Sequence, residues 1–108
     1  MTFQLNARPA SELAAERGEV LRKQLTAAID NHVESVAKSR EYNNAAALAG
    51  YANSTVPEWA AEAQTFVAWR DAVWLQTFTM LEQVMSGALT PPTEEELLAS
   101  FPEIVWPD

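Results

Sequence analysis

Residues 54–87 read STVPEWAAEAQTFVAWRDAVWLQTFTMLEQVMSG, and the rest of the chain is organised around them. Apolar side chains recur here at steps of three and four residues, which predicts a helix. Thr55 and Glu58 have the pattern of a capping box at its start, and Gly87 is a typical stop at its end. We therefore expect a central helix over residues 55–86, roughly 45 Å long at about 1.5 Å per residue.

The predicted central helix has a main apolar stripe and a second, partly apolar side. The stripe consists of Trp59, Ala63, Phe66, Val67, Arg70, Val73, Trp74, Phe78, Leu81, Val84 and Met85. Because a buried guanidinium must be paired, we expect Arg70 to be a buried structural charge, with binding of an external carboxylate as the alternative. Trp69, Leu75 and Met80 point away from the stripe. If Trp69 and Met80 are uncovered, they form an apolar patch that favours self-association or a protein partner.

The remaining patterns predict a single all-α domain, a helical hairpin of two long antiparallel helices with two short helices and an extended C-terminal tail. They place an extended arm over 1–8, a first long helix over 9–41, a short helix over 43–53, the central helix over 55–86, a second short helix over 93–100 and the tail over 101–108. In the short helices we expect Leu48 and Tyr51 to point inward, and Thr93 with Glu96 to form a capping box.

The predicted tail is rich in apolar residues although it has no predicted secondary structure. Ile104, Val105 and Trp106 follow one another in it. Such side chains expose a large apolar surface unless something covers them. We expect them either to dock on the central helix of the same subunit or to reach into a partner. They join Trp69 and Met80 as candidate partner-binding residues.

Residue types that carry catalysis or bind metals are scarce. The 108 residues include no cysteine, three isolated glycines and one histidine, His32, which lies on the apolar side of the first predicted helix. This placement favours a partly buried, hydrogen-bonded structural role over that of a catalytic base. No His-x-x-x-His or Glu-x-x-His pair and no glycine-rich phosphate loop occurs in the sequence. We therefore expect no enzyme activity, no catalytic residue, no metal site and no cofactor.

Charge is distributed unevenly along the chain, whose net charge is −8. Residues 1–40 hold six basic and five acidic residues, a balance of +1, whereas residues 41–108 hold one basic and ten acidic residues, a balance of −9. The simplest interpretation is mutual attraction between the two parts, and the alternative is that the acidic part offers a landing surface to a basic partner. Without a basic surface, we expect no direct nucleic-acid ligand. Without a run of eighteen apolar residues, we expect no membrane span.

Several short segments together resemble a helical module of small proteins from the tail region of tailed bacteriophages and prophages. The resemblance rests on AGYANSTVP at residues 49–57 running into AEA at 61–63, on WRDAVW at 69–74, on PPT at 91–93 with EL at 96–97, and on the ending from FP at 101–102 to VWP at 105–107, in this order. It covers about residues 35–107. Proteins of this kind are usually described as hypothetical tail or tail-fibre assembly proteins, and no catalytic residue accompanies the module.

The resemblance implies a non-enzymatic phage tail accessory protein that binds or chaperones a tail-fibre protein or another tail protein. A second copy of the chain is a further candidate partner, and the implied location is the host cytoplasm or the virion tail. The alternative function belongs to a different class: an acidic decoy that occupies the nucleic-acid-binding site of a host protein, suggested by the charge of residues 41–108. A decoy requires its carboxylates to lie on one exposed face.

Overall fold

The computed structural model describes residues 9–108, and every regular element within them is a helix. The elements are α1 (Ala10–Ser39), α2 (Ala45–Ala49), α3 (Pro57–Met85) and α4 (Glu94–Ser100). The predicted all-α fold, the order of its helices and the extended tail after α4 are therefore confirmed. The predicted arm over residues 1–8 lies outside the described residues.

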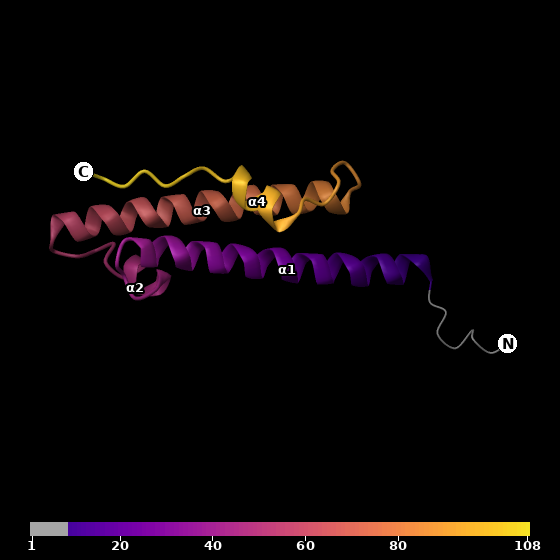
Figure 1. Ribbon diagram of the computed structural model, residues 1–108, viewed down its shortest axis with the longest axis horizontal. Helices are drawn as coiled ribbons and strands as arrows, with labels where there is room; N and C mark the ends of the chain where they lie inside the picture. Colours follow the sequence, from indigo (N-terminus) through magenta and orange to yellow (C-terminus); the bar gives the residue numbers. More distant parts are fainter. Residues whose placement is uncertain (1–8) are drawn as a thin grey trace.

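The two long helices run antiparallel and side by side (Figure 1). α2 lies where they are joined and contacts both, α4 packs on α1, and the tail over residues 101–108 runs back along α3. We name the end that contains the connection between α1 and α3 the closed end. The open end contains the start of α1 and the end of α3. The additional elements therefore cover the hairpin from its middle towards its closed end.

α3 begins at Pro57, two residues later than the predicted start of the central helix at residue 55. Val56 is its N-cap residue and has no capping side-chain bond, and Pro57 occupies the first turn. Proline disfavours helical geometry in the residue before it, and Val56 is accordingly extended, with φ −90° and ψ 112°. The prediction of a capping box at Thr55 is therefore wrong, because Pro57 decides where the helix starts.

The two long helices end in similar turns formed by different residues. After α3, Gly87 has a φ of 83°, which confirms the predicted stop. After α1, the corresponding position is occupied by Glu41, with a φ of 71°, and the Tyr42 N–H donates to the Ala37 carbonyl at 3.3 Å. A residue other than glycine costs about 1 kcal/mol in this left-handed conformation. The turn after α1 is therefore strained, whereas the turn after α3 is not.

Side-chain caps start both short helices. The Thr93 hydroxyl accepts from the Glu96 N–H and the Thr93 N–H donates to the Glu96 carboxylate, so the predicted capping box is confirmed. The Asn44 side chain caps α2, which is only five residues long. Leu48 of α2 is buried as predicted, but Tyr51 lies beyond the helix and is 39% exposed rather than inward.

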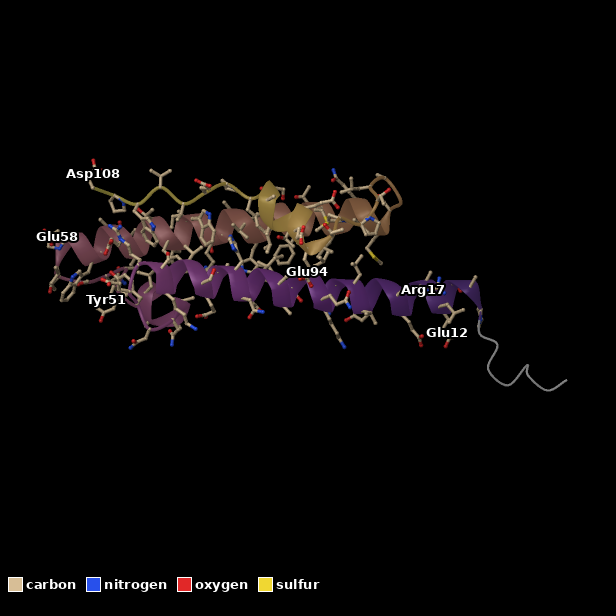
Figure 2. The ribbon with its side chains drawn as sticks, viewed as in Figure 1. Glu12, Arg17, Tyr51, Glu58, Glu94 and Asp108 are labelled. Carbon is tan, nitrogen blue, oxygen red and sulfur yellow. The ribbon has the colours of Figure 1, made fainter. Side chains whose placement is uncertain are left out.

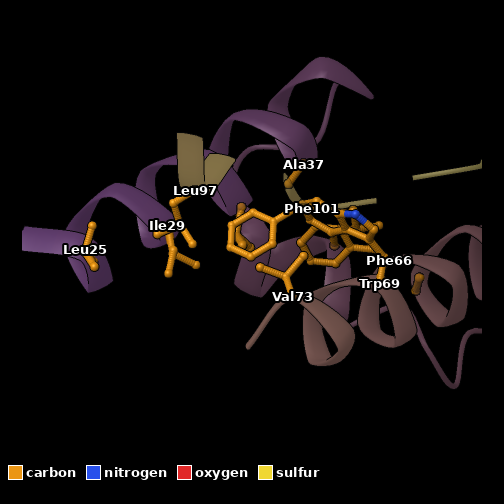
Figure 3. Close-up of a cluster of buried hydrophobic side chains, with 11 residues drawn as sticks. Leu25, Ile29, Ala37, Phe66, Trp69, Val73, Leu97 and Phe101 are labelled. Atoms are coloured by element: carbon orange, nitrogen blue, oxygen red, sulfur yellow. The ribbon is translucent and has the colours of Figure 1, made fainter. Parts of the chain in front are cut away.

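The core lies between α1 and α3, where α2 and α4 close over it (Figure 3). It consists of Leu25, Ile29, Val33, Ala37, Leu48, Ala63, Phe66, Trp69, Val73, Leu97 and Phe101. Steps of three and four residues give each long helix one buried side. No residue of α1 before Leu25 is buried, and none of α3 after Thr77. The open end therefore has no buried core of its own.

The buried side of α3 is rotated relative to the predicted stripe. Trp69 belongs to it, whereas Trp59 is 48% exposed, Phe78 52% and Met85 66%. The prediction that these last three residues are buried is therefore wrong. The tail and α4 lie over the side of α3 that carries Trp69 and Gln76. These contacts join segments that are far apart in the sequence, and helical periodicity does not reveal them.

Candidate protein-binding surface

Trp69 is a core residue rather than a surface residue. It is 7% exposed, and its indole N–H donates a 2.7 Å hydrogen bond to the Pro102 carbonyl of the tail. Its ring centroid lies 6.0 Å from that of Phe66 and 5.7 Å from that of His32. The prediction of an exposed, partner-binding Trp69 is therefore wrong, because the tail covers this side chain and Trp69 in turn holds the tail on α3.

The other four predicted partner-binding residues differ in exposure. Met80, Ile104 and Trp106 are partly buried and pack against the core, whereas Val105 is 83% exposed. The tail thus docks on its own subunit, which was one of the two predicted alternatives. Of its three predicted interface residues, Val105 alone is turned outward. A partner-binding role for Val105 stays a prediction.

Arg70 is not a buried charge. Its side chain is 34% exposed and donates a 2.9 Å hydrogen bond to Asp71, whose side chain is 57% exposed. The prediction of a buried ion pair is wrong, because the flexible side chain of Arg70 turns to its neighbour in sequence at the surface. Such exposed pairs contribute little to stability.

Three exposed apolar side chains of α3 lie together near the open end. Leu75 is 66% exposed, Phe78 52% and Met85 66%. At about 100° per residue they span an arc of about 80° around the helix, so they form one line along it. We name these three residues the apolar ridge. The partly buried ring of Trp74 lies beside the ridge, with its centroid 6.0 Å from that of Phe78.

A shallow groove of about 580 Å³ continues the apolar ridge between the first half of α1 and the end of α3. Its lining is mostly apolar and includes Ala14, Gly18, Leu21, Val84, Met85 and Pro91. Gly18 lets the two helices approach closely, because a Cβ atom at this position would lie 3.3 Å from Met85 Sδ. Since the ridge and the groove share Met85, they form one continuous apolar surface.

Sequence reasoning missed this surface, although the sequence contained a signal for it. Phe78 and Met85 were assigned to the buried stripe, and Leu75, which points away from that stripe, was not named as a partner-binding candidate. The repeated apolar residues in the second half of α3 exceed what one core-facing side requires. That excess is the signal, but it does not by itself say which side is buried.

The closed end is held by a polar network. Arg40 pairs with Glu62 and lies over the Trp106 ring, 5.1 Å from the ring centroid. The Tyr42 hydroxyl donates a 2.9 Å hydrogen bond to the same carboxylate. These hydrogen bonds, above all that from Arg40, lower the pKa of the Glu62 carboxyl group, and burial followed by the bond to Glu62 raises the pKa of Tyr42. The network ties α1, α3 and the tail together.

The carboxylates of α3 do not share one face. Glu62 and Asp71 are nine residues apart, which places them about 180° apart around the helix. Both are also paired with a cation, Glu62 with Arg40 and Asp71 with Arg70. α3 therefore does not present the single acidic face that a nucleic-acid decoy requires.

The groups that most often carry chemistry are dispersed. His32 is partly buried as predicted, but its ring packs against the rings of Trp69 and Phe101, with centroids 5.7 and 6.3 Å away, rather than making the predicted hydrogen bonds. Among residues 9–108, no three side chains of His, Asp or Glu lie close enough together to hold a metal ion. None of the described helices is both long and apolar enough to cross a membrane.

Comparisons with protein-family models, curated proteins and solved structures find no match to this chain. The resemblance to phage tail-region proteins therefore stays a prediction that rests on the segments quoted above.

Proposed function

We propose that this chain is a non-enzymatic binding protein that associates with a phage tail or tail-fibre protein during assembly. The apolar ridge is the observation that carries this proposal. Its three side chains, Leu75, Phe78 and Met85, are more than half exposed and lie in line on one helix. Exposed apolar patches of this kind are one mark of a protein–protein interaction site.

A partner that covers the ridge gains free energy from burial. Full burial of one large apolar side chain contributes about 1.5–3 kcal/mol, so the ridge offers several kcal/mol. Association must also offset the loss of translational and rotational freedom, which takes about 4–15 kcal/mol. The groove beside the ridge supplies part of the additional contact area, and its concave shape suits a protruding helix or loop of a partner.

The assignment of the partner to the phage tail rests on the resemblance. Two of the resembling segments, residues 69–74 and residues 105–107, belong to the packed part of the molecule, where Trp69 holds the tail through Pro102. The resemblance therefore concerns mainly the scaffold. The ridge is an exposed apolar part of this scaffold that a partner can cover.

The acidic-decoy alternative has weaker support. It requires carboxylates along one face, but Glu62 and Asp71 lie on opposite sides of α3 and are both paired. Glu96 is likewise engaged in the capping box of α4. We therefore favour the tail accessory function.

The test is co-expression with a tail-fibre protein of a tailed bacteriophage, followed by size-exclusion chromatography with light scattering. The wild-type chain should form a joint peak with the fibre protein. The double variant Leu75→Ser/Phe78→Ser should lose that peak while its melting temperature stays close to that of the wild type, because both positions are exposed. Val20→Ser, which changes an exposed apolar residue of α1 rather than one of the ridge, is the matched control and should keep the joint peak.

Three other outcomes would contradict this account. Loss of the joint peak with Val105→Ser, but not with the ridge variant, would assign partner binding to the tail. Separate peaks for the wild-type chain and the fibre protein would exclude a stable complex between them. A wild-type chain that elutes as a dimer, with the dimer lost in the ridge variant, would make a second copy the occupant of the ridge.

A further inference from the structure

An aromatic patch lies at the closed end, away from the apolar ridge. Trp59 is 48% exposed and Tyr51 is 39% exposed, and their rings meet edge to face with centroids 5.6 Å apart. The ring of Tyr42 adjoins that of Tyr51, with centroids 5.8 Å apart. We name Tyr42, Tyr51 and Trp59 the aromatic patch. Trp59 does not belong to the core, since about half of this residue faces solvent.

The aromatic patch is held in place by its neighbours. The Tyr42 hydroxyl is fixed by its 2.9 Å bond to Glu62. The Tyr51 N–H donates a 3.0 Å hydrogen bond to the carbonyl of Leu48, whose side chain is fully buried. Trp59 lies in the first turn of α3, where Pro57 restricts the backbone. A surface that is ordered before binding loses less conformational entropy when a partner docks.

Exposed acidic residues lie at the same end as the patch. Glu41 precedes Tyr42 and Glu58 precedes Trp59, and both are exposed. Figure 2 shows Glu58, Tyr51 and Asp108 at this end of the molecule, with Asp108 on the other side of α3 from Tyr51. The nearby cations are Lys38, in the last turn of α1, and Arg40, which is already engaged by Glu62 and Trp106. The electrostatic potential around the patch therefore favours a cation.

The closed end already binds one guanidinium group in this way. Arg40 lies over the ring of Trp106 with 5.1 Å between its Cζ atom and the ring centroid, and it pairs with the Glu62 carboxylate. An indole ring and a carboxylate thus hold an arginine side chain within the same subunit. Trp59 presents an indole ring with the same chemistry, and about half of its surface is open.

We propose that the aromatic patch binds an arginine side chain from a basic segment of a partner protein. The planar guanidinium group stacks on the exposed ring of Trp59, and Glu58, which is exposed in the same helical turn, adds negative charge to this end of the molecule. Arginine fits better than lysine because its planar, weakly hydrated group stacks on aromatic faces. This site goes beyond the proposed function, since it lies on a different part of the molecule and does not depend on the identity of the tail partner.

The test uses the peptide acetyl-Gly-Arg-Gly-Arg-Gly-amide and an analogue in which neutral citrulline replaces both arginines. In NMR titrations of the full chain, the arginine peptide should shift the indole N–H signal of Trp59 more than those of the other tryptophans. Trp59→Leu should weaken binding about five- to tenfold, and Glu58→Gln about two- to threefold. Phe78→Leu, a change of an exposed aromatic residue on the apolar ridge, is the matched control and should leave the affinity unchanged.

Equal binding of the citrulline analogue would overturn the proposal, because the interaction would not require a cation. Unchanged affinity in both Trp59→Leu and Glu58→Gln would place the peptide elsewhere on the acidic surface. Both substitutions change exposed residues, and a melting curve for each variant verifies that it is folded. The binding assay contains no tail protein, so its result is independent of the test of the proposed function.

Discussion

The closed half of the hairpin and its open half contain similar helices but are packed differently. Helix α1 contacts α2, α3 and α4, and all its buried residues lie within residues 25–39. Residues 10–24 of α1 and residues 78–85 of α3 contain no buried residue, although they include Leu21, Phe78 and other apolar side chains. The same helical periodicity therefore builds a core in one half and an uncovered apolar surface in the other.

This difference suggests a division of roles along the molecule. The closed half supplies most of the stability, because burial of apolar surface is the dominant favourable contribution to folding. The open half contributes length and an exposed surface, and a partner that covers it would complete its packing.

The largest effect is expected from Phe66→Ala in the closed half. Phe66 is fully buried, so its truncation should lower the free energy of unfolding by about 3–5 kcal/mol. Phe78→Ala makes the same chemical change on the apolar ridge and should cost less than about 1 kcal/mol. Urea denaturation of both variants measures the two losses. Equal losses would show that the open half is packed in solution, for example by a second copy.

Acid sensitivity should also differ between the two halves. The pKa of Glu62 in the folded state lies below its usual value of 4.5, because Arg40 and Tyr42 donate hydrogen bonds to the ionised carboxylate. Its ionised form therefore stabilises the fold above pH 4.5, and this contribution is lost as the pH falls through the lower folded-state pKa. The wild-type protein should accordingly lose stability on acidification, and the Glu62→Gln variant should lose less.

Glu19 is the matched comparison in the open half. A hydrogen bond from Arg22 lowers its pKa as well, but both side chains are about half exposed, so solvent weakens their interaction. The urea midpoint of each variant and of the wild type is measured at about pH 7 and at about pH 3. The difference between these two midpoints should therefore be altered less by Glu19→Gln than by Glu62→Gln. A larger effect of Glu19→Gln would contradict the account of the closed-end network.

A smaller effect is expected at the strained turn of the closed end. Glu41→Gly should raise the free energy of unfolding by about 0.5–1 kcal/mol, because glycine adopts a φ of 71° without steric cost. Glu41→Ala removes the same charge but keeps a Cβ atom, so it should bring no such gain. Thermal or urea denaturation distinguishes the two variants. A similar gain in both would show that the charge of Glu41, rather than its backbone conformation, is unfavourable.

The smallest effect is expected at the helix crossing of the open end. Gly18→Ala should stabilise the protein by no more than about 0.5 kcal/mol, because alanine favours the helix but its Cβ atom would lie 3.3 Å from Met85 Sδ. Met85 is 66% exposed, so its flexible side chain is free to move away. Urea denaturation measures the change. If Gly18→Ala lowers the stability instead, Met85 is held firmly, and the open half is packed more tightly than the exposure of its residues indicates.

Local sequence signals predicted the elements of the fold well. Gly87 and the capping box of Thr93 with Glu96 act over a few residues, and both lie in the structure where the sequence placed them. The periodicity of the two long helices is equally local. The start of α3 was predicted two residues too early, because the preference imposed by Pro57 on Val56 prevails over the capping pattern at Thr55.

The sides of α3 could not be assigned from periodicity alone. This helix is apolar on more than one side, so the sequence did not distinguish Trp69, which the tail covers, from Trp59, which remains exposed. The position of the tail is a contact between segments about thirty residues apart, and no local rule predicts it. Arg70 was misassigned for the same reason, since its exposure follows from which side of α3 the core occupies.

Amide hydrogen exchange, measured residue by residue on the isolated chain, tests the division between the two halves most directly. We expect the amides of α1 from residue 25 to residue 39 to exchange far more slowly than those from residue 10 to residue 24, because the open half lacks buried contacts that oppose local opening. Residues 78–85 of α3 should exchange as fast as the first half of α1. Uniform protection along the whole of α1 would contradict this account.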